Sequence, residues 1–226
     1  MHLTGCWNRY LNGFREVVYL ARAAKAAPVS IISGGSVSEQ QILVRAAIVL
    51  LASHVEAFFS EIADDFMDVI DSRSYNTQPP GVQRYVALQA ADALLSAIDS
   101  VGDGYDEKQR TQFYRRILTA SRWMKDPGRV AEASKPRLRE FYKQKGVKAI
   151  DKYLSLFCSR RIKFFDWLGS IGVDRVRFAT VIEGLITARN EIAHGNNGST
   201  SLGVQDLRDY VAITTVMLRR VDQYLD

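Results

Sequence analysis

Along most of the chain, hydrophobic residues recur every three or four positions, with polar residues between them. This spacing places the hydrophobic side chains on one face of an α-helix. It predicts helices over approximately residues 7–26, 36–70, 82–99, 106–124, 137–144, 147–158, 160–168, 174–194 and 204–225. No segment shows the alternation of apolar and polar residues that indicates a β-strand. The sequence therefore predicts an all-α helical bundle.

Two of the predicted helices begin with recognisable N-terminal signals. Ser36 and Glu39 have the spacing of a capping box, in which the serine accepts a hydrogen bond from the helix and the glutamate accepts one in return. Asp174 is the expected N-cap of a later helix. The predicted core residues of that later helix are Val176, Phe178, Val181, Ile182, Leu185, Ile186 and Ala193. The helix over 36–70 is the longest and is predicted to lie at the centre of the bundle.

The composition is that of a soluble globular protein, with 47% hydrophobic and 24% charged residues among 226. The only two cysteines, Cys6 and Cys158, exclude a disulfide framework and favour a reducing compartment. The most apolar stretch, residues 42–52, contains Arg45 and is too short to span a bilayer, and the N-terminus lacks the pattern of a signal peptide. We therefore expect a cytoplasmic protein that forms one domain over residues 1–226 and has no membrane anchor.

The charge is distributed unevenly around a formal net value of +5. Residues 36–104 contain three Lys or Arg against ten Asp or Glu, whereas residues 105–165 contain seventeen against six. The basic region favours a polyanionic partner such as RNA. The alternative is that these helices simply carry solvated basic faces, since a count along the chain does not establish a patch in space.

Within the basic region, three cations are interleaved with aromatic residues. Arg160, Arg161 and Lys163 are candidate RNA-binding residues that would follow a phosphate backbone. The neighbouring aromatic residues, which would stack on bases in that interpretation, are Phe157, Phe164, Phe165 and Trp167. Their helical spacing is more typical of packing in the core.

Two candidate catalytic residues, Arg189 and His194, lie near the C-terminus at the end of a predicted amphipathic helix. Imidazole takes and gives protons near neutrality, and guanidinium is a permanent cation whose shape fits phosphate oxygens. An ordinary helix end explains the same residues, because a basic residue there offsets the helix dipole and Gly195 suits the position after the cap.

Other candidate sites are weaker. His54 lies among apolar residues in the middle of a predicted helix and is interpreted as a core residue. No cluster of histidine, cysteine or carboxylate has the spacing of metal ligands, so we expect no metal and no other cofactor. Neither Gly34-Gly35 nor residues 102–104 form a phosphate-binding loop.

Two stretches together resemble HEPN domains, and most closely the RiboL-PSP-type HEPN group. They are Leu51-Ala52-Ser53-His54-Val55-Glu56-Ala57-Phe58-Phe59 and Leu185-Ile186-Thr187-Ala188-Arg189-Asn190-Glu191-Ile192-Ala193-His194-Gly195. The resemblance covers residues 36–71 and 173–226, which would form the core of the domain. The basic helical region, about 105–168, would be an insertion into it.

The resemblance implies a metal-independent endoribonuclease, of a kind found as toxins or effectors in toxin–antitoxin and anti-phage systems. It implies a homodimer with the motif at the interface and an antitoxin or activating partner protein. The catalytic residues of the family fall on Arg189 and His194, with Asn190 and Glu191 supporting them. Glu56 and Ser53 match a position characteristic of the subgroup, where a packing or capping role remains equally open.

The implied reaction follows from the chemistry of RNA. At about 100° per residue, Arg189 lies roughly 140° around the helix from His194. The long Arg189 side chain must therefore bend around the helix to come near His194. A two-fold related partner chain would complete the pocket. A histidine takes the proton of a 2′-OH, that oxygen attacks phosphorus, and Arg189 stabilises the developing charge. We expect a 2′,3′-cyclic phosphate, a 5′-OH, no need for magnesium and no cleavage of DNA.

Two alternatives remain at this point. A non-catalytic HEPN adaptor would bind RNA or a partner protein through the same groove, although the intact Arg189 and His194 pair argues against it. An unrelated helical interaction module would carry the motif by coincidence.

Overall fold

The computed structural model describes residues 4–30, 37–71, 146–158, 160–195 and 202–225, together with isolated positions between 77 and 118. These ranges contain six α-helices and no β-strand, which confirms the predicted all-α class. The helices are α1 (Thr4–Ala26), α2 (Glu39–Asp71), α6 (Val147–Leu154), α7 (Phe164–Ser170), α8 (Arg175–Ala193) and α9 (Val204–Leu225). The helix predicted over 137–144 lies outside the described residues, and those predicted over 82–99 and 106–124 are described only at isolated positions.

The chain divides into two compact units. The first contains residues Met1–Ile62, Arg137–Lys152 and Ile162–Asp226, and the second contains Ala63–Pro136 and Tyr153–Arg161. All of the predicted catalytic residues lie in the first unit, which takes in α1 as well as most of the predicted core. The single domain over 1–226 stays a prediction.

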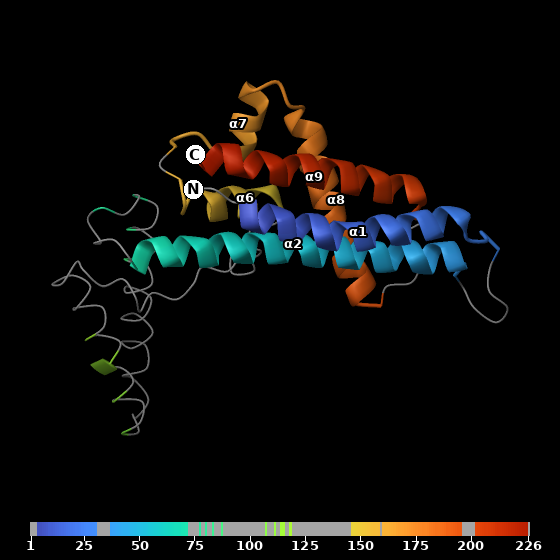
Figure 1. Cartoon of the computed structure of the whole chain (residues 1–226), viewed down its shortest axis with the longest axis horizontal. Coiled ribbons are helices and arrows are strands. Elements are labelled where there is room, and N and C mark those ends of the chain that lie inside the picture. Colours follow the sequence, from blue (N-terminus) through green and yellow to red (C-terminus); the bar gives the residue numbers. More distant parts are fainter. Residues whose placement is uncertain are drawn as a thin grey trace. The chain divides into compact units, whose positions relative to one another are not determined.

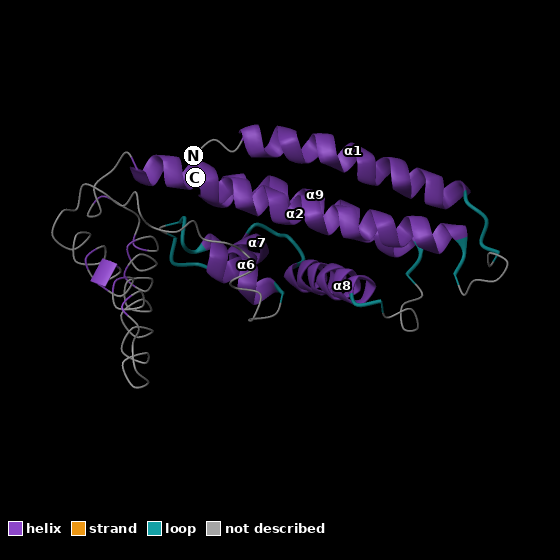
Figure 2. Cartoon of the chain, turned by 90° about the horizontal axis from the view of Figure 1, so that it is seen from below, coloured by secondary structure: helices purple, strands orange, loops and turns teal. Residues whose placement is uncertain are grey.

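One buried cluster in the core of the first unit is formed by side chains from α1, α2, α8 and α9. Figure 1 shows α1, α2 and α9 roughly aligned, with α1 running opposite to α2 and α9, while α8 crosses them, and Figure 2 shows α8 almost along its axis. The buried cluster that joins these helices comprises Val17, Ala24, Val44, Ala47, Ile48, Leu51, Ala52, Leu185, Ala188 and Leu207. Each fully buried valine, leucine or isoleucine contributes about 1.5–3 kcal/mol relative to an exposed one, so this cluster fixes α8 against α2.

The N-terminus of α2 is capped by Ser38, two residues later than predicted. The Ser38 Oγ accepts a hydrogen bond from the Gln41 backbone N–H at 3.2 Å, and the Gln41 Oε1 accepts one from the Ser38 N–H at 3.0 Å. This is a capping box, but it uses Ser38 and Gln41 in place of Ser36 and Glu39. The Gln40 Nε2 also donates to the Ala24 carbonyl at 3.0 Å, which ties the start of α2 to the end of α1.

The apolar character of α2 extends beyond the 42–52 stretch noted in the sequence. Within Glu39–Asp65, an 18-residue window has a mean hydropathy of 1.9, so by length and composition alone this helix is long and apolar enough to cross a membrane. Val44, Ile48 and Leu51 are fully buried against the other helices of the first unit. A central helix of a bundle has this same composition, because it is apolar on most of its faces.

Helices α6 and α7 are shorter than the periodicity predicts. The helix expected over 147–158 ends at Leu154, and the one expected over 160–168 runs from Phe164 to Ser170. Lys163 has extended backbone angles and no side-chain cap, and a carboxylate oxygen of Asp151 accepts from the Phe165 N–H at 3.0 Å instead. Burial raises the pKa of Asp151, and the hydrogen bond from Phe165 opposes that rise.

Helix α8 begins as predicted but buries a different face at its ends. The Asp174 carboxylate accepts from the Arg177 N–H at 3.0 Å, which confirms Asp174 as the N-cap. The buried residues of α8 are Phe178, Ile182, Leu185 and Ala188. The predicted core positions Val176, which is 74% exposed, and Ala193, also exposed, are wrong, since each lies in the first or last turn of α8 with its side chain in solvent. The last helix, α9, has the predicted bounds.

Candidate functional site

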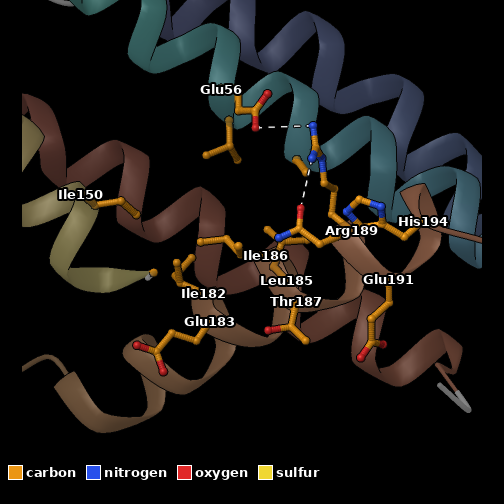
Figure 3. Close-up of a pocket in the computed structure, with 14 residues that line it drawn as sticks. Glu56, Ile150, Ile182, Glu183, Leu185, Ile186, Thr187, Arg189, Glu191 and His194 are labelled. Atoms are coloured by element: carbon orange, nitrogen blue, oxygen red, sulfur yellow. Dashed lines mark hydrogen bonds and ion pairs between the residues drawn. The ribbon is translucent and has the colours of Figure 1, made fainter. Parts of the chain in front are cut away.

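A cavity of about 600 Å³ lies where α2, the start of α6 and α8 meet. Its apolar lining comes from Ala52, Val55, Ile150, Ile182, Leu185 and Ile186. Its other lining residues are Glu56, Gly146, Glu183, Thr187, Arg189, Asn190, Glu191 and His194. Four of these belong to the Arg189–His194 motif, and Glu56 comes from the stretch of α2 that the sequence singled out. The structure therefore brings most of the predicted site residues to one cavity (Figure 3).

Arg189 is held from two sides. Its Nη2 lies 3.8 Å from the Glu56 Oε1, and its Nη1 donates to the Asn190 Oδ1 at 3.1 Å. The Arg189 and Glu56 side chains are 39% and 41% exposed, so the ion pair contributes at most about 1 kcal/mol. Its effect is to set the direction of the guanidinium, which keeps further N–H donors for a ligand.

His194 is the C-cap residue of α8. Its backbone N–H donates to the Asn190 carbonyl at 3.0 Å, and Gly195 follows with φ +71°, a left-handed conformation that glycine adopts readily. The imidazole is exposed and, within the described part of the chain, makes no hydrogen bond or ion pair. The ordinary helix-end interpretation thus describes the backbone of His194 and leaves its side chain available.

Arg189 and His194 approach the cavity from the same side of α8 (Figure 3). The angle of roughly 140° between them assumes an ideal helix. That angle describes where each side chain leaves the helix, and the side-chain torsions then determine where the guanidinium and the imidazole ring lie. The long Arg189 side chain extends toward α2, where Glu56 meets it.

Glu191 points away from Arg189 (Figure 3). Its Oε2 is buried and has no hydrogen-bond partner among the described residues. Burial first, then Asp206 and Glu191, raise the pKa of Tyr210 on α9. Glu191 is therefore close enough to Tyr210 of α9 to affect its pKa, and among the described residues no ion pair joins Glu191 to the guanidinium of Arg189.

Ser53 does not line the cavity. It is exposed, and its Oγ donates to the Val49 carbonyl at 3.0 Å within the same helix. Of the two subgroup residues, only Glu56 reaches the cavity.

The aromatic residues of the basic region pack in the interior, as their spacing indicated. Phe157, Phe164 and Phe165 are 5%, 0% and 1% exposed, and Trp167 stacks on Phe164 with a centroid separation of 6.1 Å. These three phenylalanines are not available to stack on bases.

The interleaved cations Arg160, Arg161 and Lys163 are exposed and do not line the cavity. Their binding of RNA stays a prediction. Among the described residues, no group of three His, Cys, Asp or Glu side chains is arranged to hold a metal ion.

His54 occupies a packed position between α1 and α2, in keeping with its interpretation as a core residue. Its side chain is 23% exposed, and its Nε2 lies 3.9 Å from the Glu16 Oε2. The ring lies directly over Gly13, where an added Cβ would come within 2.2 Å of it.

Sequence reasoning did not single out Gly146, Ile150, Glu183 or Thr187 as site residues, although all four line the cavity. Thr187 belongs to the stretch of α8 that resembles HEPN domains, and the other three lie outside both resembling stretches. One signal was present, since Glu183, Thr187 and Glu191 recur every four residues on α8 and so share a face.

A family model described as RiboL-PSP-HEPN matches residues 9–226. The match takes in α1 and the basic region as well as the two ranges on which the sequence resemblance was based. No curated protein and no solved structure matches the chain.

Proposed function

Because the chain belongs to the RiboL-PSP-HEPN family, we propose that it is a metal-independent endoribonuclease whose reactive groups are Arg189 and His194. HEPN domains have nuclease or other RNA-related functions. One observation carries the choice of residues: a guanidinium oriented by Glu56 and an exposed imidazole line the same cavity. A phosphate binder and a proton acceptor are the two groups that cleavage by an internal 2′-OH requires.

The reaction begins when the His194 imidazole takes the proton of a 2′-OH. The 2′-oxygen then forms a bond to the adjacent phosphorus, and the bond from phosphorus to the 5′-oxygen breaks. Arg189 stabilises the negative charge on the phosphoryl oxygens while five oxygens surround phosphorus. A protonated donor gives its proton to the departing 5′-oxygen. The products are a 2′,3′-cyclic phosphate and a 5′-OH.

A second copy of the chain would complete this site. One chain supplies one histidine to the cavity, whereas the reaction needs a base and an acid at the same time. A two-fold dimer that faces two α8 helices would bring two His194 side chains and two Arg189 side chains together. An enzyme assembled in this way suits a cytoplasmic toxin or anti-phage effector that an antitoxin or activating partner controls.

Arg189→Ala provides the first test, with Arg177→Ala as its matched control. Both arginines are on α8, but Arg177 is 63% exposed, lies 4.0 Å from Asp209 and does not line the cavity. With purified protein, RNA and EDTA, wild type and Arg177→Ala should yield 2′,3′-cyclic phosphate ends, whereas Arg189→Ala should be slower by about 100-fold or more.

Equal rates for the two variants would contradict the proposed role of Arg189. RNA binding without cleavage by wild type would favour the non-catalytic adaptor. Growth arrest on expression of wild type but not Arg189→Ala would support the toxin role.

A further inference from the structure

The end of the cavity farthest from the motif has a composition of its own. It is formed by Gly146, Ile150, Ile182, Glu183 and Ile186, which we call the Glu183 subsite. Ile150 and Ile182 are each 2% exposed, so they form a packed apolar floor. The proposed catalysis uses none of these residues.

Gly146 and Glu183 lie in close contact at this end. Gly146 has φ +64° and is buried, and a Cβ built on it would lie 2.6 Å from the Glu183 Cγ and 3.1 Å from its Oε1. The absence of a side chain at Gly146 therefore makes room for the glutamate beside the start of α6. Within the described residues, the Glu183 carboxylate makes no hydrogen bond or ion pair. It is a positioned acceptor whose oxygens the protein leaves available.

Glu183 and Arg189 line the same cavity from different turns of α8. Glu183 precedes Arg189 by six residues, which is about 9 Å along a helix axis and about 120° around it, so the two side chains leave α8 in different directions. A nucleotide bound in the cavity would extend from Arg189 at its phosphate to Glu183 at its base. In Figure 3 the two side chains also extend from different parts of α8, with Ile182 and Ile186 between them. The cavity volume of about 600 Å³ lies within the range of small-ligand sites.

The carboxylate in the Glu183 subsite favours the base of a nucleotide over its phosphate. A carboxylate repels phosphate, so Glu183 is unsuited to the backbone and suited to N–H groups on a base. Guanine presents two adjacent donors, N1–H and N2–H₂, which match the two oxygens of a carboxylate. Adenine and cytosine each present one amino group, and the N3–H of uracil stands between two acceptors. Single-stranded RNA exposes these edges for recognition.

We propose that the Glu183 subsite binds guanine, in the nucleotide whose 3′-phosphate contacts Arg189. The base lies on Ile150, Ile182 and Ile186, and the Glu183 carboxylate accepts from N1–H and N2–H₂. This inference rests on the proposed ribonuclease function for its choice of ligand. It predicts that cleavage leaves guanosine 2′,3′-cyclic phosphate at the new 3′ ends.

The test measures binding apart from cleavage. Isothermal calorimetry of the full chain with the 3′-monophosphates of guanosine, adenosine, cytidine and uridine should give at least about tenfold tighter binding for guanosine. Glu183→Gln should abolish this preference, because its amide presents a donor to the donors of guanine. Glu39→Gln, a carboxylate lost from the start of α2 outside the cavity, should leave the preference unchanged. The Glu183 side chain is exposed, so all three proteins should fold and melt alike.

Mapping of RNA ends supplies the second readout. Wild type should leave guanosine at most new 3′ ends, and Glu183→Gln should keep the cyclic phosphate but lose that bias. A guanine preference in calorimetry without any cleavage would support the subsite and contradict the ribonuclease. If cleavage needs Arg189 but Glu183→Gln has the same base preference as wild type, the guanine subsite is wrong and the ribonuclease proposal stands.

One further outcome would also overturn the guanine assignment. If no nucleotide binds and Glu183→Gln changes the molecular mass in light scattering, a second copy of the chain covers this end of the cavity.

Discussion

The two described histidines show how surroundings decide what one side chain does. His54 lies between α1 and α2 with its ring over Gly13, and its buried Nε2 has no hydrogen-bond partner in the part of the chain that the structure describes. His194 lies at the end of α8, exposed beside a cavity that Arg189 also lines. The first histidine fills space in a helix contact, and the second is exposed to solvent. The α1–α2 contact should therefore govern stability, and the cavity should govern activity.

The largest expected effect comes from exchanging each histidine for alanine. His194→Ala should lower the cleavage rate by about 10²–10⁴-fold with little change in melting temperature, because it removes the proton acceptor but no packed contact. His54→Ala should lower the melting temperature and leave the rate per folded molecule unchanged, because it leaves a gap above Gly13. The rate and the melting temperature of both variants would be measured in the same buffer. Equal losses of rate in both would show that the distinction between the two regions is wrong.

Gly13→Ala tests the packed side of the comparison. The new Cβ would come within 2.2 Å of the His54 ring, so we expect a loss of about 1–3 kcal/mol in the free energy of unfolding. Gly13→Ala combined with His54→Ala should recover much of that loss, because the ring is the group that the methyl meets. Denaturant unfolding of the single and double variants measures the coupling. Additive losses would indicate that the cost arises elsewhere.

The fold was largely predictable from the sequence because the periodicity of a helix and its buried face depend on residues that are close together in the sequence. The bounds of α9 and the cap at Asp174 needed only nearby residues. The cap of α2 was misplaced because Ser36 and Ser38 both begin a capping-box pattern. What favours Ser38 is a contact distant in sequence, from Gln40 to Ala24. The early start predicted for α7 failed for a similar reason, since Asp151 on α6 supplies the partner for its first turn.

The cavity was predictable only in the part that a motif marks. Arg189 and His194 were singled out from their spacing, and Asn190 and Glu56 from the resemblance to HEPN domains. Glu183 and Gly146 stayed hidden because their relation is a close approach between α8 and the start of α6, which no local pattern records.

Glu56→Gln should have only a small effect on stability. The pair it forms with Arg189 is 3.8 Å long and about two-fifths exposed, so the free energy of unfolding should change by less than about 1 kcal/mol. The guanidinium would lose its partner on α2 but keep the hydrogen bond to Asn190, so its direction would be less restricted. We expect a cleavage rate several-fold lower than that of wild type and a smaller loss than Arg189→Ala causes.

Cleavage rates of wild type and Glu56→Gln at low and high salt would show whether the ion pair is the cause of this difference. Salt screens the exposed ion pair between Glu56 and Arg189 in wild type, whereas Glu56→Gln has no such pair. A large loss of stability in this variant would place Glu56 with the packed residues of α1 and α2, and an unchanged rate would show that the orientation of Arg189 does not depend on it.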